Sequence, residues 1–147
     1  MIMSENKNIN DISKAFYDPF EYLSFLKENN QFDSNFKPID KEVLYQIACH
    51  QRVQNIVSHT KRILGSIPDL DVNIAERCSG HDGTYGVRKD THTYSVQIGM
   101  PVAKKITDTT DLVVSDCVMA GNHVAHIATQ DIESIHPISL VKMAYGL

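Results

Sequence analysis

The sequence predicts an α/β fold with a mainly parallel, open sheet of about four strands and helices on both of its faces. Short apolar runs alternate with segments of about ten residues whose apolar side chains recur at helical spacing. One of these runs, residues 112–115, begins with a continuous Leu-Val-Val, which is typical of a strand covered on both faces. A helix-start signal at Asp18 adds an N-terminal helix ahead of the first strand.

Length and composition indicate one globular domain. We expect residues 1–17 to form a polar N-terminal arm and residues 18–147 to form a single α/β domain. A net charge of -4 without a run of Lys or Arg excludes a partner held by a basic patch, and nucleic acid in particular. No apolar run is long enough to span a membrane, and the N-terminus lacks the apolar core of a signal peptide, so we expect a cytoplasmic protein without a transmembrane segment.

The first half of the domain reads as helix, strand, helix. Asp18 is a good helix cap, Pro19 suits the first helical position, and Glu21 completes a capping box for a helix that ends near Asn29. Residues 43–48 are mostly apolar and predict the first strand. The apolar spacing over residues 52–64 predicts one helix that Gly65 terminates.

The second half repeats this alternation. We expect strands over residues 72–75 and 112–115, and a short fourth strand over residues 132–135. A helix over residues 89–97 should break at residues 99–101 and resume until residue 107, because Pro101 cannot donate within a helix. Further helices are expected over residues 120–129 and from Pro137, with His136 as a cap or turn residue.

Each of the three cysteines lies where a predicted strand ends. Cys49 follows the first strand, Cys78 lies just after the second, and Cys117 just after the third. Right-handed crossovers place the carboxyl ends of parallel strands at one edge of the sheet, where ligands bind in open parallel sheets. An odd number of cysteines argues against a disulfide framework. The spacing therefore leaves two alternatives open: a shared thiol site at this edge, and three separately buried core cysteines.

A shared thiolate site selects zinc, copper(I) or an iron–sulfur cluster, and helix N-termini beyond the strands would favour the thiolate form. Candidates for a fourth ligand are His81, His50 and His123. We interpret three other histidines as solvated or structural residues: His59, His92 and His126.

The turn that carries Cys78 is rich in glycine. Gly80 and Gly83 are expected to let the backbone approach a cofactor closely, as chains do at bound ligands. The spacing is neither a Walker loop nor Gly-x-Gly-x-x-Gly, so a nucleotide site is weakly supported. A nucleophilic site made of Cys78, His81 and Asp82 is conceivable but unspecific, because such partners are normally distant in sequence.

Over about residues 18–147 the chain resembles the cysteine-rich (CCG) domain of iron–sulfur oxidoreductase subunits. This family includes subunits of heterodisulfide reductase and the C subunit of anaerobic glycerol-3-phosphate dehydrogenase, and the chain is most similar to the C-terminal repeat of the latter type. The motifs that carry the resemblance occur in order: Ala48-Cys49-His50-Gln51-Arg52, Arg77-Cys78-Ser79-Gly80, Gly83-Thr84-Tyr85-Gly86, Ser95-Val96-Gln97-Ile98-Gly99-Met100-Pro101, Ser115-Asp116-Cys117 and His136-Pro137-Ile138.

The resemblance implies that Cys49, Cys78 and Cys117 bind an iron–sulfur cluster of the 4Fe-4S type, or zinc. Ser79 and Ala120 stand where the family has two further cysteines, and His81 is available as a replacement ligand. The implied function is electron transfer in an oxidoreductase, with the chain as a subunit or domain rather than a complete enzyme.

The resemblance also implies partners. A flavin dehydrogenase or a ferredoxin-type subunit would exchange electrons with the domain, and the N-terminal half of the same protein would precede it. Association with a membrane would then be peripheral and mediated by a partner. The alternative is a non-catalytic docking or structural module whose site is degenerate, empty or zinc-only.

Overall fold

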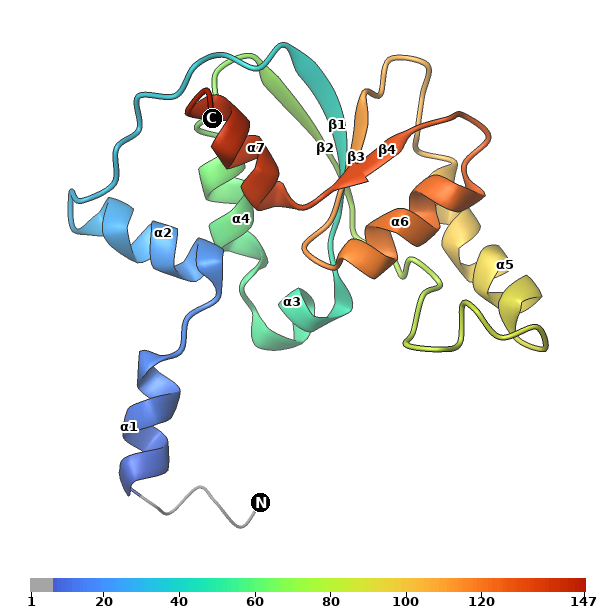
Figure 1. Ribbon diagram of the computed structural model, residues 1–147, viewed down its shortest axis with the longest axis horizontal. Coiled ribbons are helices and arrows are strands. Elements are labelled where there is room, and N and C mark those ends of the chain that lie inside the picture. The colour runs from blue at the N-terminus through green and yellow to red at the C-terminus, as the bar shows by residue number, and fades with distance from the viewer. Residues whose placement is uncertain (1–6) are drawn as a thin grey trace.

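A computed structural model describes residues 7–147 and contains a four-stranded sheet in which every neighbouring pair of strands is parallel (Figure 1). The strand order is β2-β1-β3-β4. The strands are β1 Lys41–Gln46, β2 Leu70–Ala75, β3 Leu112–Val114 and β4 Glu133–Ile135. The predicted α/β class with a parallel sheet of four strands is confirmed.

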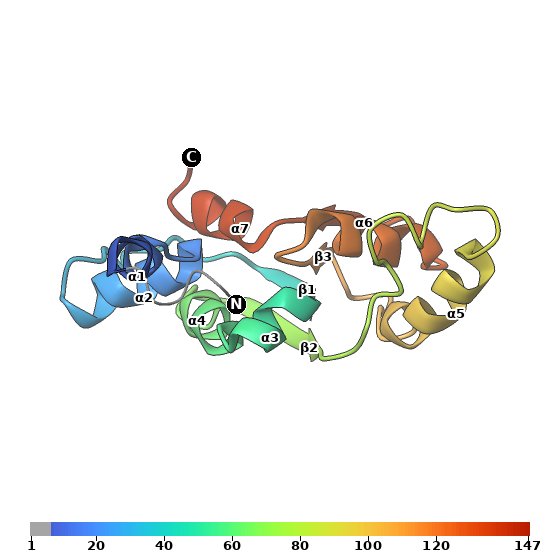
Figure 2. The same ribbon diagram turned by 90° about the horizontal axis from the view of Figure 1, so that it is seen from below.

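Helices cover both faces of the sheet (Figures 1 and 2). Helices α2, α4 and α7 lie on one side, while α5 and α6 pack together on the other. Their bounds are α1 Lys7–Ala15, α2 Pro19–Glu28, α3 Cys49–Gln54, α4 Val57–Leu64, α5 His92–Ala103, α6 Val118–Ile127 and α7 Pro137–Ala144. Within residues 7–147, no helix has the length and apolar character needed to cross a membrane.

The central strand β1 is buried on both faces because its alternate side chains enter two cores. Val43 and Tyr45 belong to the larger core with Leu140, beneath α2, α4 and α7. Leu44 belongs to the smaller core with Val124, beneath α5 and α6. Burial on both sides explains the continuous apolar run over residues 43–45 of this strand.

Two predicted helix caps are confirmed. The Asp18 side chain accepts a hydrogen bond from the Phe20 N–H at 2.9 Å, and the Asp18 N–H donates to Glu21 Oε2 at 2.9 Å. This is a capping box, and it starts α2 at Pro19 as the sequence indicates. His136 caps α7 in the same way, since its Nδ1 accepts from the Ile138 N–H at 3.1 Å.

Two expected helix boundaries are wrong. The helix expected over residues 52–64 is divided into α3 and α4, because Asn55 adopts a left-handed conformation with φ of 60° and ends α3. The break expected at residues 99–101 does not occur, and α5 runs through Pro101. Burial of Val102 and Ala103 in the core holds the last turn, even though proline removes one backbone hydrogen bond.

The N-terminal arm also differs from the expectation. Residues 7–15 form α1, whereas a loose polar segment is expected from their composition. Ile12 and Phe16 are exposed, and the helix projects away from the sheet (Figure 1). Ile9, Ile12 and Phe16 are spaced as on one face of a helix. This spacing indicates a helix, whereas the polar composition of the segment does not. The rest of the expected arm, residues 1–6, lies outside the described residues.

The connections that follow β1 and β3 lie on opposite faces of the sheet. The chain leaves β1 through α3 and α4 on one face to reach β2, and leaves β3 through α6 on the other face to reach β4. Neighbouring strands β1 and β3 therefore send their connections to opposite faces, and in open parallel sheets ligands bind outside the carboxyl ends of two such strands. Cys49 and Cys117 begin the two connections that diverge there.

Candidate functional site

The three cysteines follow three adjacent parallel strands at one edge of the sheet. Cys49 is the first residue of α3, Cys117 is the N-cap residue of α6, and Cys78 lies in the loop after β2. All three are free thiols; Cys49 and Cys78 are exposed and Cys117 is half-buried. Their position after the strand ends agrees with the prediction, and the thiols are open to a ligand or partner.

Two of the thiols make hydrogen bonds within their own segments. The Gly80 N–H donates to Cys78 Sγ at 3.4 Å, and Arg52 Nη2 donates to Cys49 Sγ at 3.5 Å. These contacts orient the Cys78 side chain in the loop after β2 and the Cys49 side chain at the start of α3.

A buried amide ties the three cysteine-bearing strand ends together. Gln46, the last residue of β1, is fully buried. Its Nε2 donates to the carbonyl oxygen of Ile47 at 2.7 Å and to that of Arg77 at 3.0 Å, next to Cys78. Its Oε1 accepts from Ser115 Oγ at 2.8 Å, and this hydroxyl in turn accepts from the Cys117 N–H at 3.3 Å. One side chain thus fixes the backbone before each thiol.

A second polar network lies on the opposite face of β1. The Tyr45 hydroxyl lies 2.7 Å from Asp116 Oδ2 and 2.8 Å from Gln51 Oε1, and Gln51 Nε2 donates to Thr60 Oγ1 at 3.1 Å. Burial raises the pKa of Asp116, against the opposing effect of the hydrogen bond from Tyr45. Burial, and then the Asp116 carboxylate, raise the pKa of Tyr45 above its usual range. The network holds α3 and the end of β3, and so the segments that carry Cys49 and Cys117.

The glycines of the turn are explained by packing and backbone conformation. Gly80 has φ of 83°, and a Cβ there would collide with the carbonyl oxygen of Ser95 in α5. Gly83 has φ of 49°, and nothing lies within 4 Å of the position that a Cβ would take. Gly80 is therefore required by close contact with α5. The expected role of both glycines in cofactor binding stays a prediction.

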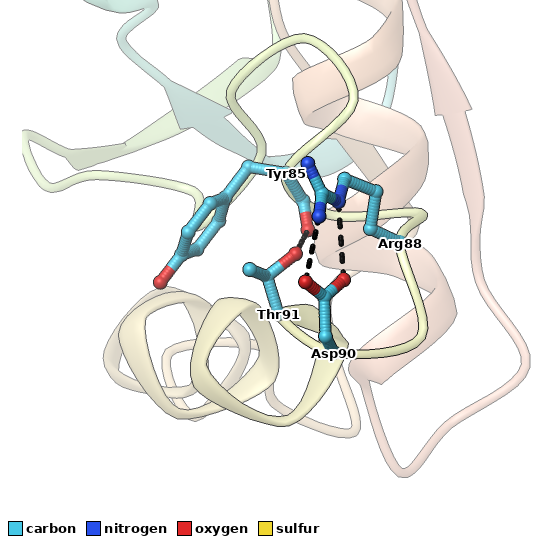
Figure 3. Close-up of polar contacts among 4 residues, drawn as sticks. All are labelled: Tyr85, Arg88, Asp90 and Thr91. Atoms are coloured by element: carbon cyan, nitrogen blue, oxygen red, sulfur yellow. Dashed lines mark hydrogen bonds and ion pairs between the residues drawn. The ribbon is translucent and has the colours of Figure 1, made fainter.

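The loop continues into a hydrogen-bonded turn before α5 (Figure 3). Arg88 forms an ion pair with Asp90 at 2.7 Å, and this pair lowers the pKa of Asp90. Thr91 Oγ1 donates to the carbonyl oxygen of Tyr85, which fastens the start of α5 to the loop. Other residues of the same turn, Gly86, Val87 and Lys89, line a cavity.

His81 lines this cavity together with three other histidines. Its ring centroid lies 6.3 Å from that of His123, and the centroid of His92 lies 6.5 Å from His123. His126 completes the set. The sequence singles out His81 and His123, whereas it places His92 and His126 in the solvated or structural class. Three segments distant in sequence form the cavity, so only the spacing of His123 and His126 on one helix could have signalled it.

The donor set does not form a complete metal site as it stands. Within residues 7–147, no group of three His, Cys, Asp or Glu side chains is placed to hold one metal ion. Ser79 is buried and accepts from the His81 N–H at 3.3 Å, and Ala120 is buried in α6. The two positions where the CCG pattern has further cysteines are therefore packed into the protein.

Comparison with known proteins identifies a relative. Over 110 residues the chain is 32% identical to the C subunit of anaerobic glycerol-3-phosphate dehydrogenase from Escherichia coli K12. The same protein of Escherichia coli O157:H7 gives the same identity, 32% over 110 residues. The chain is a homologue of this dehydrogenase component. The expected relationship is thereby confirmed.

The match covers 74% of the chain but only 27% of the length of the Escherichia coli protein. The homology therefore concerns a part of that protein about the size of one domain. No protein-family model matches the chain. No solved structure matches it either.

Proposed function

We propose that this domain binds an iron–sulfur cluster through Cys49, Cys78 and Cys117 and transfers electrons within an oxidoreductase complex like that of its dehydrogenase relative. The observation that carries the proposal is the position of three free thiols after three adjacent parallel strands. Homology to a dehydrogenase component supports the oxidoreductase class. The family resemblance of the cysteine motifs supports the cluster, with 4Fe-4S as the type.

The chemistry of the donors agrees with such a centre. Thiolates are the ligands of iron–sulfur clusters, and a bound cluster would supply one-electron transfer. Gln46 and the Asp116 network would position the thiols, because they fix the backbone on both faces of β1. Three thiols leave one position for His81, which belongs to the same loop as Cys78.

The surroundings of the thiols fit a protein partner. Val53 in α3 and Val118 and Met119 in α6 are exposed by 87%, 52% and 54%, and they belong to the helices that begin at the cysteines. Exposed apolar side chains beside a redox centre suit a docking surface. We propose a flavin dehydrogenase or a ferredoxin-type subunit as the partner, together with the further segments that the longer relative carries. The complex would be cytoplasmic or peripherally bound to a membrane through that partner.

A second function has an observation in its favour. Ser79 and Ala120 replace two cysteines of the CCG pattern, and residues 7–147 contain no preformed group of three metal ligands. These facts favour a docking or structural module whose site binds zinc or no metal. The same experiment separates the two functions.

The test is anaerobic reconstitution of the chain with iron and sulfide, followed by iron and acid-labile sulfide analysis and an absorbance spectrum. Bound iron and sulfide that are lost in Cys49→Ser, Cys78→Ser and Cys117→Ser, but retained in the control His59→Ala, support the cluster. Loss in His81→Ala as well would assign the fourth ligand. Zinc alone, or a folded protein that binds no metal, would contradict the cluster and favour the structural module.

A further inference from the structure

A cavity of about 610 Å³ lies where the glycine-rich loop meets α5 and α6. Its walls are largely apolar and include Val87 and Met119. Four of its lining residues are the histidines already described: His81, His92, His123 and His126. Predominantly apolar cavities with a few convergent polar groups are the usual sites of small ligands.

The hydrogen bonds of two histidines fix their tautomers. His92 Nδ1 lies 2.7 Å from the Gly86 carbonyl oxygen, which can only accept, so Nδ1 carries the proton. Ser95 Oγ donates its only proton to the Gly80 carbonyl oxygen at 2.8 Å, so it accepts from His123 Nε2 at 3.0 Å. In the neutral side chains, His92 Nε2 and His123 Nδ1 are therefore hydrogen-bond acceptors.

This pattern also excludes a nucleophilic serine. A serine nucleophile would have to give its proton to the imidazole, whereas the Ser95 hydroxyl is directed to a carbonyl oxygen and the residue is fully buried. The Ser95 contact instead anchors the His123 ring. Burial lowers the pKa of His123.

The charges around the cavity narrow the ligand class. The lining includes Lys89 and, within the described part of the chain, no Asp or Glu, so a cation would meet repulsion without a counter-charge. A carboxylate or phosphate could approach Lys89, but it would face the lone pairs of these two acceptor nitrogens. A neutral hydroxyl group, in contrast, can donate to an imidazole nitrogen while the rest of the molecule contacts the apolar wall.

We propose that this cavity binds a small, uncharged, largely apolar molecule with a hydroxyl group that donates a hydrogen bond to His123 Nδ1 or His92 Nε2. The proposal does not depend on a metal centre, because the hydrogen bond to the ligand uses neither a cysteine nor His81. The cavity and the thiol site meet at the loop that carries Cys78 and His81.

The test uses 4-methylphenol, toluene and 4-methylbenzoate as probes, which share a ring and methyl group but differ in the polar group. Binding to the full chain is measured by ligand-observed NMR and by the shifts of the histidine side chains. We expect 4-methylphenol to bind roughly tenfold more tightly than toluene, the ratio expected for about one hydrogen bond. The benzoate should bind more weakly than the phenol.

The variants His92→Phe and His123→Phe keep an aromatic ring but remove the acceptor nitrogen. Replacing the histidine to which the hydroxyl donates should abolish the preference for 4-methylphenol over toluene. The control His59→Phe, outside the cavity, should retain this preference. If His123→Phe fails to fold, a preference that is retained in His92→Phe requires the His123 side chain to shift on phenol binding, and the absence of that shift would overturn the proposal. The proposal is overturned by the absence of saturable phenol binding, by equal binding of toluene, or by a preference that survives in both variants. Stronger binding of the benzoate would overturn it as well.

Discussion

Replacement of Gln46 by leucine tests whether one buried amide holds the thiol edge together. Gln46→Leu keeps the size of the side chain but removes three hydrogen bonds, to Ile47, Arg77 and Ser115. At a net cost of about 1 kcal/mol for each bond, the free energy of unfolding should fall by about 3 kcal/mol. With an m-value of about 2 kcal/mol/M, this loss lowers the urea midpoint by about 1.5 M, measured by circular dichroism.

The same change should loosen the backbone before Cys78, because the Arg77 carbonyl loses its partner. Hydrogen–deuterium exchange of residues 77–80 should therefore increase more than exchange in α7, which lies far from Gln46. A matched control is Ser24→Ala, since Ser24 Oγ is the buried side-chain atom that lacks a hydrogen-bond partner within residues 7–147. That variant should be as stable as the parent or up to about 1 kcal/mol more stable. Equal effects of the two substitutions would refute the reasoning.

Three further predictions concern the loop and its surroundings. Gly80→Ala should destabilise the fold by more than about 3 kcal/mol because its Cβ meets the α5 backbone, whereas Gly83→Ala, with open space, should cost about 1 kcal/mol in the same urea assay. The lowered pKa of His123 means that its contribution to the free energy of unfolding is present above the pKa of an unfolded histidine and is lost as pH falls through the folded pKa. NMR titration should give His123 a midpoint below that of an exposed histidine. His123→Gln should reduce the loss of stability at acid pH. Under the cluster proposal, Ser79→Cys combined with Ala120→Cys should raise the iron content after reconstitution, and unchanged iron would count against the CCG-type ligand pattern.

The fold could be predicted because its signals are local. The capping box at Asp18 and the short apolar runs within β1 and β3 depend only on neighbouring residues and on burial. Local signals failed where tertiary contacts decide the outcome. Pro101 predicts a break, but burial of the following residues keeps α5 intact. Asn55 divides a helix that apolar spacing alone makes continuous.

The candidate site was only partly predictable for the same reason. The topology of a parallel sheet is enough to bring Cys49, Cys78 and Cys117 to one edge. The role of the Gln46 amide could not be predicted in this way. Gln46 looks like an interruption of an apolar run, and its partners Arg77 and Ser115 lie 31 and 69 residues away. The cavity histidines likewise come from a loop and two helices, and their proximity follows from the packing of α5 on α6.

The loop after β2 is the element through which the thiol edge and the cavity are connected. Its first part carries Cys78 and is held to β1 by Gln46, while its next residues contact α5 through Gly80 and place His81 in the cavity. Any movement that brought Cys78 toward Cys49 and Cys117 would pull on the Gly80 carbonyl and hence on the Ser95–His123 pair. Assembly of a metal centre at the edge should therefore change the environment of His123, and ligand binding in the cavity should change the ease of that assembly, because coupling between two sites is reciprocal.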